Sequence, residues 1–266
     1  MKMEKEIKSV VFTNELLTAL SNWQNGWAEI QERRYDLADE LVKQCKDVPE
    51  KFKKINSPCY RKRFIYANEL KRLFLEDDLF EGISSWTTDM NYAKGFKGYV
   101  RQGASFSMMF ECIPRPEDIV LNISELWKDE DFVHFANQFK INFPKKAKPL
   151  FNFKDTQSEV VLRSTLRSFE IRNVVGFSSS FEEICDMGNI PEDEREELSI
   201  KYEQDPNGIP INMPVFVDEI SSRESVARAI ACMKKELSSA EKENEPINWG
   251  DSDVKSMRDE IHRSQN

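Results

Sequence analysis

The sequence predicts an α+β protein with a helical first segment and a middle segment built from short strands. Apolar residues recur at three- and four-residue steps over residues 15–45, which is the spacing of one helix face. Between residues 59 and 177, short runs rich in apolar residues are separated by turn residues, as strands are. Beyond residue 177 the chain turns acidic and is broken by prolines until about residue 214. Helices followed by runs of strands are typical of the α+β class.

The N-terminal segment, residues 1–55, is expected to form helices that pack on the core. Gly26 favours a division of residues 15–45 into two helices, because glycine is a poor helix former. Pro49 and the lysines after it close the segment. The apolar positions of the predicted face are Leu16, Leu20, Trp23, Trp27, Ile30, Leu37, Leu41 and Cys45.

The middle segment, residues 56–177, is expected to form the core. Thr88 or Asp89 can cap a short helix that runs through Phe96, and a flexible glycine loop follows it. The predicted strands are residues 59–66, 80–88, 106–113, 119–123, 158–162 and 169–177. The other predicted elements are helices at residues 68–74 and 125–139 and a basic, proline-bearing loop at residues 144–153.

The C-terminal segment, residues 178–266, is expected to be an acidic, partly helical extension. Residues 221–240 carry apolar residues on one face and fit a helix. Residues 241–266 are polar and poorly patterned, so we expect much of this tail to be disordered. Four apolar residues in it are candidate contacts for a regulatory partner, namely Trp249, Val254, Met257 and Ile261.

Composition favours an ordinary globular protein and excludes several classes of site. The chain has 266 residues, of which 39% are apolar and 32% charged, and its net charge is −9. No charge-free run is long enough for a signal peptide or a membrane span, so we expect a cytoplasmic protein. The five cysteines contain no C-x-x-C pair and the two histidines have no partners at metal spacing. We therefore expect no disulfide framework, no metal site and no Cys-His mechanism.

Three short elements carry residues suited to cleavage of NAD. Breaking the bond between nicotinamide and ribose passes through an oxocarbenium-like transition state, which a facing carboxylate stabilises. Glu159 suits that role, the planar guanidinium of Arg61 suits a diphosphate, and the hydroxyl of Ser85 can orient the carboxylate, with Thr87 beside it. Each residue alone also fits an ordinary role, as a surface arginine, a turn serine or a solvated glutamate.

The order of Arg61, then Ser-Trp-Thr, then Gln-Ser-Glu resembles the R-S-E class of ADP-ribosyltransferases, which includes bacterial toxins. The fragment Ser-Ser-Trp-Thr-Thr-Asp at residues 84–89, with Ala93 and Phe96, is the closest match, and residues 118–125 resemble the strand between the second and third motifs. The resemblance covers residues 56–177 and implies a split β-sandwich core and NAD as co-substrate.

The resemblance also implies roles for particular side chains. Glu159 is the expected catalytic glutamate, and Gln157 is expected to address the acceptor from the same strand face. The expected NAD-binding residues are Arg61, Tyr60, Ser85, Thr87, Arg101 and Phe96. Residues 149–156 correspond to the loop that presents the acceptor, with Phe151 or Phe153 at its tip.

The neutral side chain of Gln157 makes arginine the least favoured acceptor, because an amide cannot pair with a guanidinium as a carboxylate does. A macromolecular acceptor is expected, either a nucleobase or an asparagine or glutamine side chain. Lysine-rich residues 51–63 and 140–154 flank the first and third motifs, and phenylalanines interleave with the second stretch, which favours single-stranded nucleic acid. An NAD glycohydrolase and a non-enzymatic binding module are the alternatives.

By analogy alone, we expect an intracellular toxin that is held by an antitoxin or used against phage.

Overall fold

A computed structural model describes residues 12–26, 31–152, 154, 157–177, 181–188, 190–203 and 214–243. The chain divides into two compact units. Unit 1 comprises residues 1–61, 78–96 and 111–166, and unit 2 comprises residues 62–77, 97–110 and 167–266. Seven strands are hydrogen-bonded in the order β4-β5-β2-β1-β3-β6-β7, and the paired strands run antiparallel. The α+β class is therefore confirmed.

The β2–β5 pair is the longest ladder of unit 1. Strand β2 (Leu79–Thr87) pairs with β5 (Glu159–Leu166) from Leu79 opposite Leu166 to Thr87 opposite Glu159. The register shifts between Phe80 and Gly82, and Gly82 has a φ of 68°, which suits glycine at a bulge. Strand β4 (Ile119–Asn122) pairs with the other edge of β5, and β1 (Cys59–Ile65) pairs with β2.

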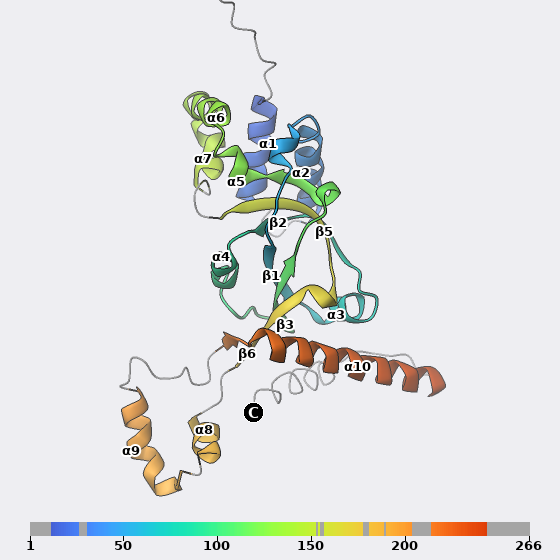
Figure 1. Ribbon diagram of the computed structural model, residues 1–266, viewed down its shortest axis with the longest axis vertical. Helices are drawn as coiled ribbons and strands as arrows, with labels where there is room; N and C mark the ends of the chain where they lie inside the picture. Colours follow the sequence, from blue (N-terminus) through green and yellow to red (C-terminus); the bar gives the residue numbers. More distant parts are fainter. Residues whose placement is uncertain are drawn as a thin grey trace, which may run out of the picture. The chain divides into compact units, whose positions relative to one another are not determined.

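Helices α1 (Asn14–Asn25) and α2 (Gln31–Gln44) lie together with α5, α6 and α7 beside the β2–β5 ladder (Figure 1). Thr13 caps α1 by accepting a hydrogen bond from the Leu16 amide at 3.1 Å. Gly26 ends α1 with a φ of 78°, so the predicted division at this glycine is confirmed. The other helical elements of unit 1 are η1 (Glu50–Phe52), α4 (Met90–Gly95), η2 (Pro116–Asp118), α5 (Ile123–Leu126), α6 (Glu130–Asn142) and α7 (Pro144–Asn152).

The core of unit 1 lies between these helices and the inner face of β2 and β5. Leu17 and Leu20 of α1, Leu150 of α7 and Val161 of β5 are fully buried in it. Phe132 packs its ring against Phe12 and Trp127 with centroid distances of 5.2 and 5.1 Å. Helix α1 is thus part of the core that holds the sheet face.

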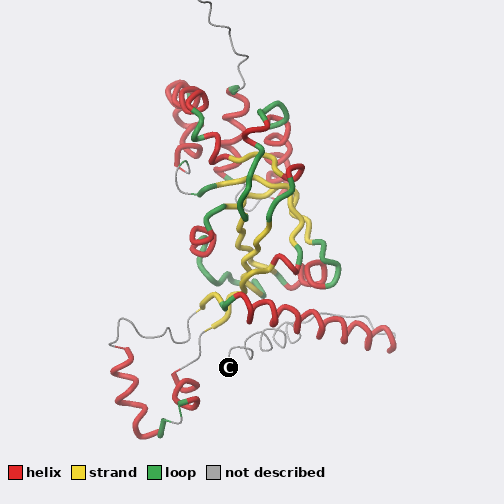
Figure 2. The backbone as a smooth tube through the Cα atoms, viewed as in Figure 1, coloured by secondary structure: helices red, strands yellow, loops and turns green. Residues whose placement is uncertain are grey.

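Unit 2 is built on β3 (Phe106–Cys112), β6 (Ile171–Phe177) and β7 (Pro214–Phe216). Ser222 anchors helix α10 (Glu219–Glu243), because its fully buried hydroxyl accepts a hydrogen bond from the Val174 amide at 3.0 Å. Figure 2 colours these elements by type. The remaining elements are α3 (Ala67–Phe74), η3 (Ser168–Glu170), α8 (Phe181–Met187) and α9 (Glu192–Glu203).

Two expected elements are wrong. Residues 144–152 form helix α7 instead of a loop: Pro144 opens the helix, where an amide proton is not needed, and Ala147 and Leu150 are buried on one face. The single helix expected at residues 125–139 is two helices, because Asp129 caps α6 by accepting from the Phe132 amide at 3.0 Å. Strand β7 was not predicted. Of the expected tail at residues 241–266, residues 241–243 belong to helix α10 and residues 244–266 lie outside the described residues.

Candidate active site

Ser85 and Glu159 meet on adjacent strands of unit 1. Glu159 opens β5 opposite Thr87, and Ser85 lies two residues before Thr87 on β2. The Ser85 hydroxyl donates to Glu159 Oε1 at 2.6 Å, across 74 residues of sequence. Arg61 reaches the same place from β1, and its Nη1 donates to the backbone oxygen of Ser85 at 2.6 Å. Of the three side chains predicted to form one site, those of Ser85 and Glu159 are therefore hydrogen-bonded to each other, and that of Arg61 contacts the backbone of Ser85.

Glu81 orients the guanidinium of Arg61, and the sequence did not single it out. Arg61 Nε donates to Glu81 Oε2 at 2.8 Å, and the two side chains are 18% and 3% exposed. Arg34 of α2 donates to the backbone oxygen of Glu81 at 2.7 Å. Glu81 is the one charged residue of strand β2, and this was the available signal.

The end of helix α1 supplies two more contacts to Glu159. Trp23 Nε1 donates to Ser85 Oγ at 3.1 Å and to Glu159 Oε1 at 3.3 Å. Gln24 Nε2 donates to Glu159 Oε2 at 2.9 Å. With Ser85, three neutral donors surround a carboxylate in a residue that is only 5% exposed. Sequence reasoning placed Trp23 on an apolar helix face and did not single out Gln24, because 135 residues separate it from Glu159.

Helix α4 places Tyr92 within the electrostatic influence of Glu159, and Phe96 directly follows the helix. Asp89 caps α4 by accepting from the amides of Asn91 and Tyr92 at 2.8 and 3.1 Å, and its own amide donates to Thr87 Oγ1 at 3.0 Å. Burial, followed by the charge of Glu159, raises the pKa of the Tyr92 phenol. The ring of Phe96 lies 5.9 Å from that of Tyr92 and is partly exposed. The predicted residues Thr87 and Phe96 are therefore linked to the cluster through α4.

Other predicted site residues are placed differently. Tyr60 is half-buried on β1 opposite Thr87. Arg101 is exposed in unit 2, where its backbone oxygen accepts from the Ala104 amide. Gln157 is half-buried but precedes β5, and Ser158 has a left-handed φ of 43°. The expectation that Gln157 and Glu159 share a strand face is wrong, because side chains alternate regularly only along extended backbone.

The expected acceptor loop is largely helix. Residues 149–152 belong to α7, and Phe153, Asp155 and Thr156 lie outside the described residues. Phe151 packs against the ring of Trp127 at 5.3 Å, so it is a core residue and not a loop tip.

The two basic stretches differ in how their lysines are engaged. In the first, Lys51 pairs with Asp129 at 2.6 Å and Lys53 lies 3.6 Å from Glu50. In the second, Lys140 lies over the ring of Phe151 and Lys146 over that of Phe143. Lysine–aromatic contacts within the chain thus account for part of the pattern seen in the sequence.

No known protein family, curated protein or solved structure matches this chain. Among the described residues, no three acidic, histidine or cysteine side chains are grouped as metal ligands, and no helix is long and apolar enough to span a membrane. The five cysteines are free thiols, and Cys45, Cys59 and Cys185 are buried.

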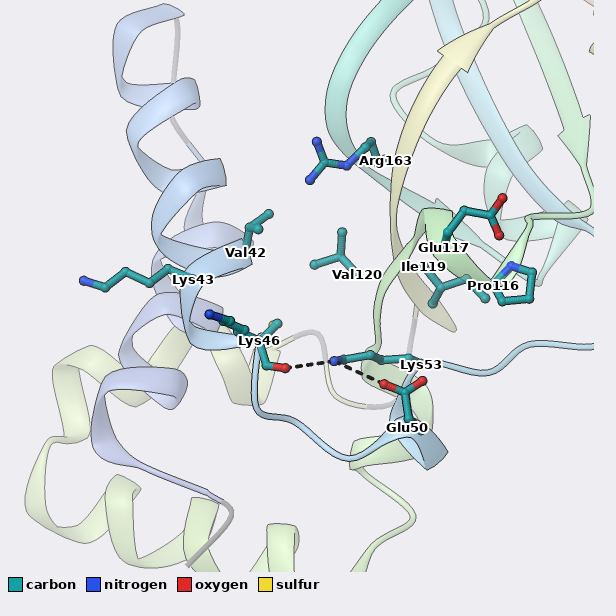
Figure 3. A pocket seen from close by; sticks show the side chains of 11 residues that line it. Val42, Lys43, Lys46, Glu50, Lys53, Pro116, Glu117, Ile119, Val120 and Arg163 are labelled. Atoms are coloured by element: carbon teal, nitrogen blue, oxygen red, sulfur yellow. Dashed lines mark hydrogen bonds and ion pairs between the residues drawn. The ribbon is translucent and has the colours of Figure 1, made fainter.

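An open depression of about 620 Å³ lies elsewhere in unit 1 (Figure 3). Lys53 spans one side of it, with contacts to Glu50 and to the backbone oxygen of Lys46. The residues that line it are Val42, Lys43, Cys45, Lys46, Glu50, Lys53, Pro116, Glu117, Ile119, Val120 and Arg163. The cluster of Arg61, Ser85 and Glu159 does not line this depression.

Proposed function

We propose that the protein is an NAD-consuming mono-ADP-ribosyltransferase whose catalytic glutamate is Glu159. The observation that supports this most is the 2.6 Å hydrogen bond from Ser85 to Glu159, with Arg61 bound to the backbone oxygen of Ser85. Three residues of the types that NAD cleavage requires lie together although the sequence separates them. A serine and a glutamate with unrelated roles, 74 residues apart in the sequence, would have no reason to share a hydrogen bond.

The proposed reaction uses the chain's own side chains for positioning and electrostatics. The bond between C1′ of the ribose and the nicotinamide nitrogen breaks, and its electron pair neutralises the pyridinium. Glu159 holds a ribose hydroxyl and faces the positive charge that develops on the sugar. Arg61 binds the diphosphate, with Tyr60, Thr87 and Phe96 as further NAD contacts. A nucleophilic atom of the acceptor then bonds to C1′ and releases its proton, while Gln157 orients the acceptor.

The acceptor we propose is a nucleobase in a single strand of RNA or DNA. The amide of Gln157 can both donate and accept hydrogen bonds, as base edges do. Lys145 and Lys148 are exposed on α7, and Phe143, which directly precedes that helix, is 38% exposed. Exposed lysines around an aromatic ring are suited to phosphates and a stacked base.

The function is tested by incubating the purified protein with NAD labelled in its adenylate part, together with separate RNA, DNA and protein pools. We expect label in the nucleic-acid pools and release of nicotinamide. Glu159→Gln removes the charge and keeps the size, so we expect it to lower both signals by at least about 100-fold. Glu130→Gln, an exposed glutamate of α6, is the matched control and keeps full activity.

The pools separate the alternatives. If label is found only in protein, at asparagine or glutamine side chains, the acceptor is a protein and not a nucleobase. Free ADP-ribose without any labelled macromolecule indicates a glycohydrolase. No consumption of NAD by the wild-type protein refutes the proposal.

The cellular role we propose is that of an intracellular toxin in phage defence, restrained by an antitoxin. Expression of the wild-type chain in a bacterial host is expected to stop growth, and Glu159→Gln is expected to restore it. Equal growth arrest by both forms at matched protein levels contradicts this role.

A further inference from the structure

The last turn of α1 contacts the carboxylate of Glu159 through two consecutive residues. Trp23 donates one indole proton to both Ser85 Oγ and Glu159 Oε1, at 3.1 and 3.3 Å. Gln24 donates to the other carboxylate oxygen at 2.9 Å. Gly26 ends the helix directly after these residues, so α1 terminates at the site. Neither residue belongs to the motifs that the sequence analysis identified.

The carboxamide of Gln24 leaves one polar atom without a partner. Its nitrogen faces Glu159, because the reversed amide would set an oxygen against the carboxylate. Its oxygen, Oε1, is buried and accepts no hydrogen bond from the described part of the chain. Buried acceptors of this kind are rare in folded proteins and lose free energy when no donor reaches them.

Helix α1 is a fixed wall of the site and not a removable plug. Trp23 is 3% exposed and belongs to the core together with Leu16 and Leu20 of the same helix. Ser21 donates to the backbone oxygen of Lys146 in α7. Withdrawal of α1 from Glu159 therefore requires the opening of the core.

We propose that Gln24 is a substrate-binding residue and Trp23 a positioning residue of the NAD site, an inference that rests on the proposed function. The ribose attached to nicotinamide carries two neighbouring hydroxyls. On binding, the Gln24 side chain turns away from Glu159 while α1 stays in place, so that Glu159 accepts a hydrogen bond from one hydroxyl and Gln24 Oε1 accepts from the other. Trp23 holds Ser85 and Glu159 in the orientation that meets the sugar, and it does not contact the substrate.

Two NAD analogues test the role of Gln24, each lacking one hydroxyl of the nicotinamide ribose. Binding is measured from the rapid change in tryptophan fluorescence, before turnover. We expect the wild-type protein to bind each analogue about tenfold more weakly than NAD. Gln24→Met keeps the length of the side chain and removes its amide, so the variant can no longer contact one of the two hydroxyls. It is therefore expected to bind the analogue that lacks this hydroxyl as tightly as it binds NAD. Gln44→Met, which alters a half-buried glutamine bonded to Glu40, keeps both tenfold differences.

The role of Trp23 is tested by Trp23→Phe, with Trp86→Phe as the matched control. Trp86 is equally buried, and its indole donates to Ser84 instead of Ser85. We expect Trp23→Phe to lower kcat for nicotinamide release at least tenfold while Kd for NAD changes less than threefold. Trp86→Phe is expected to leave both values within about twofold of wild type, which separates positioning from a general effect of losing a buried indole.

Three outcomes overturn the inference. If Gln24→Met still binds both analogues about tenfold more weakly than NAD, substrate binding by Gln24 is refuted and the proposed function is unaffected. Higher activity in either α1 variant identifies α1 as inhibitory and likewise refutes the inference alone. Failure of the wild-type protein to bind NAD at all refutes both the inference and the proposed function.

Discussion

Replacement of Glu81 by glutamine tests whether the site depends on a buried ion pair. Arg61 Nε lies 2.8 Å from Glu81 Oε2, and the glutamate side chain is 3% exposed. Removal of one partner from a buried pair costs about 3–5 kcal/mol, because the other charge stays buried without compensation. Glutamine keeps an oxygen that accepts from Arg61, so we expect Glu81→Gln to cost about 2–3 kcal/mol, close to the value of one charge-assisted hydrogen bond. For a protein of this size, that lowers Tm by roughly 4–12 °C.

The assay is urea unfolding followed by tryptophan fluorescence, together with a calorimetric measurement of Tm. Glu125→Gln is the control, because Glu125 forms a 2.6 Å pair with Lys128 but both side chains are exposed, at 40% and 70%. An exposed pair contributes less than about 1 kcal/mol, so this variant stays near the wild-type Tm. Arg61→Gln combined with Glu81→Gln is expected to cost less than the two single changes added together. Equal, small losses for Glu81→Gln and Glu125→Gln refute the reasoning.

Three further predictions concern buried groups outside the Glu159 cluster. Burial lowers the pKa of Lys62 from 10.5 to about 8, so between these pH values the unfolded chain binds a proton that the folded chain lacks. The free energy of unfolding of the wild type is therefore expected to rise from pH 8 to 10.5 relative to Lys62→Met in urea titrations, and a constant difference contradicts this. Burial raises the pKa of Cys45 and Cys59 to about 12, so at pH 8 only about one thiol in ten thousand is ionised. Ellman's reagent is therefore expected to modify the half-buried Cys112 first, and Cys45 and Cys59 only as the protein unfolds. Immediate labelling of Cys45 or Cys59 contradicts their burial. Phe132→Ala removes a fully buried ring that contacts two other rings. It is expected to lower the free energy of unfolding in urea by about 3–5 kcal/mol. A decrease below about 1 kcal/mol contradicts the place of Phe132 in the core.

Local patterns in the sequence predicted most of the regular structure. The apolar spacing gave the course of helix α1, and Gly26 marked its end, because a glycine tolerates the left-handed conformation that ends a helix there. Alternation and turn residues placed β1, β2 and β3 within one or two residues of their observed bounds. Residues 144–152 were misread, because two prolines favour a loop, whereas burial of Ala147 and Leu150 stabilises a helix.

By itself, the sequence determined most of the helix and strand segments and supplied three residues, Arg61, Ser85 and Glu159, of types that suit NAD cleavage. Only the tertiary structure decided that Glu81 holds Arg61, 20 residues away in the sequence. The same is true of the hydrogen bonds from Trp23 and Gln24 to Glu159, which span 136 and 135 residues. Helix and strand patterns arise from neighbours within a few positions, so they can be read along the chain. A hydrogen bond between a helix end and a distant strand depends on how the whole core packs, and no short stretch of sequence specifies that.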